Sequence, residues 1–371
     1  MTPPPENRCK NNNPRQVFSI GFWSGLVVLS LLASPAQAEW TVTGTGILFW
    51  TDDIGIFSAT RRLSRDGDPT QPALDTRLTD KGSSVVFEPQ LNISTSHQNR
   101  LGTLQLSVLG QGFIFTEDSR FNQGMLRLQA VQSVSPETRL RLRYEYVPDQ
   151  FLGDNEDRHP GQTGLVGETL TSNIWSARIE HDVTPDLEVK LLGRFGIRRY
   201  NEAFEERDLN FWTIGPHMDW RITPRVKLGF GYHYERGLAD GRNQPELEDD
   251  VSYINHYFSA DLDIELMKRL SLLTAFHYEY NIWTSGIVGD ERNGAHENIF
   301  QGEAILVYQV DECVRVFFWC PALKPERKFR TKRGEEYKRW NRRAGGFLKG
   351  MENQSHSRSQ ARAASRSFVL K

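Results

Sequence analysis

About a dozen segments of this chain alternate apolar with polar residues, and this period of two constrains the fold more than any other feature. The clearest segment runs from Arg139 to Tyr146. Its leucines and tyrosines fall on one face of a strand, while its arginines and Glu145 fall on the other. In a soluble sandwich the charged face would meet water. In a membrane barrel it would line the interior, and the apolar face would meet lipid.

The alternating segments are joined by two kinds of connection. Proline turns at 135–138, 184–187 and 222–225, and the turn 267–269, each precede an amphipathic segment, as expected of residues that preset a turn. We expect strands near 40–51, 84–97, 101–116, 123–134, 138–147, 170–183, 187–200, 209–222, 225–236, 250–266, 270–283 and 298–310. Strands of this length can cross a bilayer at a tilt.

Short turns and long loops fall on opposite sides of this arrangement. The long loops are 52–83, 148–169, 237–249 and 284–297. Porins show that asymmetry, whereas a sandwich does not need it. Paired tyrosines also end three strands, at 144/146, 232/234 and 278/280, as an interfacial girdle requires. The sequence therefore predicts an all-β fold, an antiparallel transmembrane β-barrel of about 12 strands.

The N-terminal segment is typical of an export signal. A basic stretch precedes the short apolar run 25–33, and Ala36 and Ala38 supply the small residues of a cleavage site. We predict that residues 1–38 form a cleaved signal peptide; a single membrane anchor is the alternative, but the run is short for one. In lipid, only helices and closed barrels can satisfy all their backbone hydrogen bonds. An exported chain of alternating strands that lacks a spanning helix is therefore predicted to be a barrel in the cell outer membrane.

The composition changes near residue 319. Residues 321–371 contain 15 lysines and arginines against 4 acidic residues, although the whole chain has a net charge of −2. We therefore predict a barrel over 39–318 and a basic disordered tail over 319–371. A reading-frame shift is the other interpretation. Read one nucleotide later from Phe318, permitted codons encode a hairpin ending in an aromatic strand, which would give about 14 strands.

The inward-facing charges are the candidate functional residues. We expect a lumen charge ladder made of Arg139, Arg141, Arg143, Glu145, Lys190, Arg194, Arg198, Arg225, Lys227, Asp261, Asp263 and Glu265. In a water-filled pore such a wall would select polar or charged solutes. In a narrow barrel the same charges would pair and fill the interior, and the sequence leaves both interpretations open.

Signals for catalysis or metal binding are weak. The loop 148–169 carries five acidic residues or histidines near its start, but without the spacing of a calcium loop. His217, His233 and His277 are expected to be hydrogen-bonded wall residues. No serine lies in a nucleophile-elbow motif, and the three cysteines do not make a metal framework. We predict no enzyme, no metal and no cofactor.

The signal, the turn-and-girdle pattern and the alternation over about 39–318 resemble Gram-negative outer-membrane β-barrel proteins of the porin kind. The resemblance implies a passive channel, an export pore for polysaccharide or a surface scaffold. We predict diffusion of small hydrophilic solutes through a protein surrounded by outer-membrane lipid, without nucleic acid. The alternatives are an exopolysaccharide export pore and a structural barrel whose acidic loops bind a partner or cation. The sequence departs from the pattern at 368–371, which supplies no terminal aromatic strand.

Overall fold

The structure is a computed structural model that describes residues 39–51, 54, 83–162, 164–290, 292–310, 315–330 and 367–370. The predicted signal peptide 1–38, with Ala36 and Ala38, lies outside the described residues. So does almost all of the loop 52–83. None of the described helices is long and apolar enough to cross a membrane.

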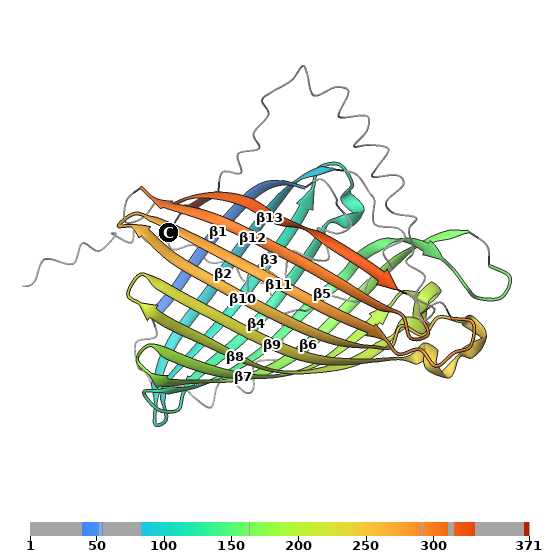
Figure 1. Cartoon of the computed structure of the whole chain (residues 1–371), viewed down its shortest axis with the longest axis horizontal. Helices are drawn as coiled ribbons and strands as arrows, with labels where there is room; N and C mark the ends of the chain where they lie inside the picture. Colours follow the sequence, from blue (N-terminus) through green and yellow to red (C-terminus); the bar gives the residue numbers. More distant parts are fainter. Residues whose placement is uncertain are drawn as a thin grey trace, which may run out of the picture. The chain divides into compact units, whose positions relative to one another are not determined.

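Fourteen strands form one antiparallel sheet (Figure 1). They are β1 (Glu39–Thr51), β2 (Ser84–Asn99), β3 (Gly102–Phe115), β4 (Gln123–Ser133), β5 (Thr138–Glu156), β6 (Leu165–Thr184), β7 (Leu187–Tyr200), β8 (Leu209–Thr223), β9 (Val226–Ala239), β10 (Tyr253–Met267), β11 (Leu270–Trp283), β12 (His296–Gln309), β13 (Arg315–Arg330) and β14 (Ser367–Leu370). From β1 to β13 each strand pairs with its successor in the chain, and β14 pairs with the free edge of β1. The twelve predicted strands correspond to β1–β12, so the predicted all-β antiparallel fold is confirmed.

The hairpin of β5 and β6 extends further than the alternation indicated. The predicted strands end at 147 and begin at 170, whereas the observed ladder runs on to the pair Glu156 and Leu165. The register shifts twice on the way, and Asp149 takes a left-handed conformation with φ of 43°. An irregular stretch of this kind interrupts the period of two, which hides the outer part of the hairpin from pattern analysis.

The two faces of the sheet differ in the sense expected for a membrane barrel. On β7, the apolar residues Leu191 and Phe195 are 49% and 47% exposed. Arg194 and Arg198, which point to the other face of the same strand, are only 5% and 0% exposed. A soluble sheet would bury the apolar face, because burial of apolar surface drives folding in water. Here the charged side chains are buried and the apolar side chains are exposed.

Aromatic rings follow one another across the exposed face. Ring centroids are 5.4 Å apart for Tyr144 and Trp175, and 5.2 Å apart for Trp212 and Tyr234. His256 continues the row at 5.5 Å from Tyr234. These rings lie where the girdle was predicted, and we call the row Tyr232, Tyr234, His256 and Tyr280 the outer aromatic row.

The polar face is strongly curved. Nη1 of Arg198 on β7 donates to the hydroxyl of Tyr253 on β10 at 3.0 Å, although two strands separate them. Nη1 of Arg194 lies 3.8 Å from Oε2 of Glu235 on β9. Side chains of non-neighbouring strands meet only where their common face is concave, so the charged residues point toward the inside of the curve.

The tail differs from the sequence prediction in its first part. Instead of disorder from residue 319, β13 continues to Arg330 and pairs with β12 along its length. The register between β12 and β13 shifts opposite the segment with Pro321 and Pro325. Proline has no N–H to donate to a ladder, so it is tolerated at an edge strand or an irregularity of this kind. Residues 331–366 lie outside the described residues, and no ladder joins β13 to β14 in the described part of the chain. The frame-shift hypothesis remains a prediction.

Candidate functional site

A chain of ion pairs crosses the polar face near the short turns. Its members, here called the wall ladder, are Arg141, Glu180, Arg139, Glu188, Lys190, Asp219 and Lys227. Nε of Arg141 lies 2.7 Å from Oε1 of Glu180, and Nζ of Lys190 lies 2.7 Å from Oδ2 of Asp219. The ladder therefore links five successive strands, β5 to β9, through alternating charges.

Strand register explains this ladder. Glu180 on β6 is the partner of Arg139 on β5 and of Lys190 on β7, so one carboxylate stands between two cations. Opposite charges in such cross-strand positions each contribute about 0.2–1 kcal/mol. The alternation predicted which residues point inward, but only the register determines which of them meet.

The other predicted wall residues lie in varied surroundings. Glu145 pairs with Arg127 at 2.7 Å, and Arg143 donates to the amide oxygen of Gln129 at 3.2 Å. Arg225 lies exposed in the turn before β9. A ladder between Lys227 and the acids of β10 was expected, and Asp263 is indeed the register partner of Lys227. The ion pair of Lys227 goes instead to Asp219 on β8, at 3.1 Å. Asp261 and Glu265 are half-buried on the same face as Asp263.

The middle of the polar face holds a buried group that joins the predicted wall residue Arg198 to Glu235, which was not among the predicted residues. Oε1 and Oε2 of Glu235 accept hydrogen bonds from Tyr253 and Thr213, at 2.5 and 2.6 Å. Arg198 donates to the same tyrosine, and its guanidinium lies 4.2 Å from the ring centroid of Phe211. We call this the mid-wall group. The alternation of β9 places Glu235 inward, which was the available signal.

A row of rings lies beside the mid-wall group. His217 and His233 share a hydrogen bond between their Nε2 atoms, His233 stacks on Tyr257, and Tyr257 bonds to His277. This histidine row fits because Gly215 leaves room, since a Cβ there would lie 2.0 Å from Cδ2 of His233. The three histidines are thus hydrogen-bonded to their neighbours in the wall.

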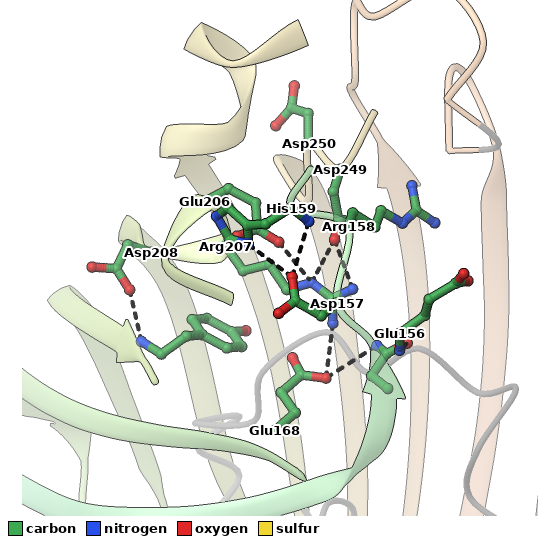
Figure 2. Close-up of polar contacts among 12 residues, drawn as sticks. Glu156, Asp157, Arg158, His159, Glu168, Glu206, Arg207, Asp208, Asp249 and Asp250 are labelled. Carbon is green, nitrogen blue, oxygen red and sulfur yellow. Dashed lines mark hydrogen bonds and ion pairs between the residues drawn. The ribbon is translucent and has the colours of Figure 1, made fainter. Parts of the chain in front are cut away.

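At the opposite end of the strands, charges from separate loops converge (Figure 2). Arg207 belongs to the 3-10 helix η4 (Glu202–Arg207) between β7 and β8. Its guanidinium lies 2.8 Å from Oε2 of Glu168 and 2.7 Å from Oδ2 of Asp249, and Asp249 also binds Arg292. All four side chains are at least nine-tenths buried. This loop cluster joins the connections β7–β8, β9–β10 and β11–β12 to β6.

Glu206 is a buried carboxyl group beside the loop cluster. Its side chain is 1% exposed, and neither carboxylate oxygen accepts a hydrogen bond within the described chain. Burial, reinforced by the charge of Asp249, raises the pKa of Glu206 to about 7, although Arg207 opposes the shift. A proton on Glu206 would therefore stabilise the cluster near neutral pH.

The acidic loop before β6 folds back on itself. Oδ1 of Asp157 accepts hydrogen bonds from the backbone N–H and from Nδ1 of His159, both at 2.9 Å. This hydrogen bond to Asp157 raises the pKa of His159. Asp154 pairs with Arg120 at 3.2 Å. Among the residues that the structure describes, no group of three or more His, Cys, Asp or Glu is arranged to hold a metal ion.

No protein-family model and no curated protein matches this chain. Several solved structures are similar to it. The outer membrane channel DcaP of Acinetobacter baumannii is 9% identical, with 91% of this chain and 97% of that chain covered and a TM-score of 0.46. The NanC porin is 9% identical, with 72% and 100% covered and a TM-score of 0.34. OmpT of Vibrio cholerae is 8% identical, with 66% and 89% covered and a TM-score of 0.34. They are of the class that the sequence resemblance indicated.

Proposed function

We propose that this protein is a porin-like channel of the cell outer membrane through which small hydrophilic solutes diffuse passively. The observation that carries the proposal is the reversal of the two faces: arginines and glutamates are buried on the same strands whose leucines and aromatics are exposed. Such a sheet is stable where hydrocarbon covers the apolar face and water or solute reaches the concave polar face.

The wall would act on a passing solute through paired charges. In the wall ladder each cation has a carboxylate within about 3 Å, so a solute meets adjacent donors and acceptors rather than one dominant sign. This lining suits molecules rich in hydroxyl groups or carrying both charges. Arg143 on the same face also donates hydrogen bonds to the amide oxygen of Gln129, at 3.3 and 3.2 Å.

Conductance of the refolded protein in planar bilayers tests the channel. We expect discrete current steps that grow with salt concentration. Arg143→Glu reverses one charge on the wall and should move the reversal potential in a salt gradient toward cation selectivity. Arg100→Glu, in the turn between β2 and β3, makes the same change of charge away from the wall and is the matched control. Equal reversal potentials for both variants would contradict a role of the wall in selectivity.

A scaffold with a closed interior is the second candidate. The mid-wall group favours it, because Arg198, Tyr253 and Glu235 bond across the concave face and are almost completely buried. A barrel filled in this way would display its loops without passing solutes. A preparation that is folded, as judged by heat-modifiable migration in gels, but silent in bilayers would remove the channel proposal and support the scaffold.

The membrane position and the orientation belong to the same proposal. Export by the predicted signal would deliver the chain to the outer membrane, with the short turns in the periplasm and the loop cluster outside. The long connections gathered at one end of the strands support this orientation. Protease added to intact cells should cut the connection 157–164 and spare the short turns; the reverse pattern would contradict the orientation.

A further inference from the structure

A cavity opens between two loops at the end of the strands that carries the loop cluster. Its volume is about 580 Å³, and its lining includes Arg236 and Leu238 of β9, Arg242 in the connection β9–β10, and Ile287 and Val288 in the connection β11–β12. Ligand pockets in proteins commonly measure about 300–1,000 Å³, so the cavity is large enough for a headgroup. It is called the loop groove below.

The loop groove faces the apolar side of the sheet. Arg236 and Leu238 have the same parity on β9 as Phe230, Tyr232 and Tyr234, whereas the inward residues are His233 and Glu235. Tyr234 belongs to the outer aromatic row, and Arg236 follows it by two residues. At about 3.3 Å per residue, Arg236 lies roughly 7 Å beyond that row toward the loops.

The two arginines of the groove are paired differently from those of the wall. Nη1 of Arg236 donates to Oγ1 of Thr284 at 2.9 Å, which fixes the guanidinium without neutralising it. Within the described residues, neither Arg236 nor Arg242 forms an ion pair. The carboxylate among the lining residues is Asp250, whose Oδ1 accepts a hydrogen bond from the backbone N–H of Ser252. The groove therefore keeps cationic groups for a ligand, whereas Arg139 and Arg141 of the wall ladder have acidic partners.

We propose that the loop groove binds the phosphate-bearing headgroup of a membrane lipid. This inference rests on the membrane position proposed above. Guanidinium groups bind phosphate oxygens through paired, charge-assisted hydrogen bonds. Leu238, Ile287 and the 91% exposed Val288 offer apolar contacts to the part of the lipid that joins the headgroup to its acyl chains. Asp250 also lines the groove and suits a hydroxyl group of a sugar headgroup.

Native mass spectrometry of the folded protein in detergent micelles tests the proposal. The probes are lipid A, which carries phosphates on a disaccharide, and the same glycolipid after removal of its phosphates. We expect the intact protein to retain lipid A, and Arg236→Gln with Arg242→Gln to lower retention about tenfold, which corresponds to about 1.4 kcal/mol. Inorganic phosphate should compete weakly, since it lacks the apolar contacts; full competition at low concentration would show that free phosphate is the ligand and would overturn the lipid assignment.

Two control variants make the outcome decisive. Arg236→Lys with Arg242→Lys keeps both charges and should retain most of the lipid. Arg221→Gln with Arg225→Gln removes two cations from the short-turn end of the sheet and should leave retention unchanged. Equal retention of lipid A by the double glutamine variant and by the unmodified protein would overturn the proposal. So would equal retention of lipid A and of the dephosphorylated glycolipid by the unmodified protein. Heat-modifiable migration verifies folding of each variant, and bilayer conductance is measured separately, so a silent channel would not count against the groove.

Discussion

Replacing Arg207 by methionine should loosen the loops at one end of the sheet. Arg207 is 3% exposed and stands between Glu168 and Asp249, with a carboxylate oxygen of each within 3 Å. Methionine fills a similar volume but leaves both carboxylates buried without this cation. Such an uncompensated buried charge costs about 3–5 kcal/mol.

The remaining partners set the expected size within that range. Asp249 keeps its ion pair with Arg292, and Glu168 keeps a hydrogen bond from Nδ2 of Asn155 at 3.2 Å. We therefore expect Arg207→Met to lower the free energy of loop opening by about 3 kcal/mol, the lower end of that range. Since 1.4 kcal/mol corresponds to a factor of ten, opening should become about a hundredfold more frequent.

Amide hydrogen exchange measures this opening directly. The backbone N–H of Asp240 bonds to the carbonyl of Asp208, and that of Thr284 bonds to Ser252, so both amides report on joined loops. Arg120→Met is the matched control, because Arg120 also binds two carboxylates but its side chain is 53% exposed. Its loss should cost about 1 kcal/mol or less. Unchanged exchange in Arg207→Met, or equal effects of the two variants, would refute the assigned role of the loop cluster.

Two further predictions concern pH and the lipid-facing surface. Because the pKa of Glu206 is raised from 4.5 to about 7, the folded loops bind its proton more tightly than the unfolded chain does, so loop stability should fall as pH rises through that interval. Glu206→Gln should abolish the pH dependence of hydrogen exchange in the loops between pH 4.5 and about 7, whereas the control His159→Asn should retain it. If Glu206→Gln exchanged with the same pH dependence as the unmodified protein, Glu206 would not be the group responsible. Leu191→Arg places a cation on the exposed apolar face of β7 and should destabilise the protein in lipid vesicles by about 2–4 kcal/mol, as followed by heat-modifiable migration during urea titration. Unchanged stability would mean that this face does not contact hydrocarbon.

The strands could be predicted from the sequence because each of them keeps the period of two. Inward and outward positions of β7 differ so clearly in polarity that the strand 187–200 was placed at its observed bounds. The outer part of the β5–β6 hairpin was missed where Asp149 and the register shifts break the alternation. The part of β13 beyond residue 318 was missed because a ladder of main-chain hydrogen bonds tolerates a basic, proline-containing sequence.

The candidate site could be predicted only in part. The alternation places Arg139, Arg141 and Lys190 on the polar face of their strands, but it does not give their partners, because a pair depends on the register between strands. The loop cluster was beyond pattern analysis. Arg207, Asp249 and Arg292 lie in three separate connections, and only the folded chain brings them within ion-pair distance.

The order of the strands has a consequence for assembly. From β1 to β13 every ladder joins neighbours in the chain, so contact order is low and each hairpin can form before its successor arrives. The ladder between β1 and β14 is the exception, because it joins one end of the sheet to a segment near the opposite end of the sequence. We therefore expect the ladder between β1 and β14 to form last. Until it forms, the main-chain hydrogen-bonding groups at the edge of β1 are open to pairing with any strand nearby.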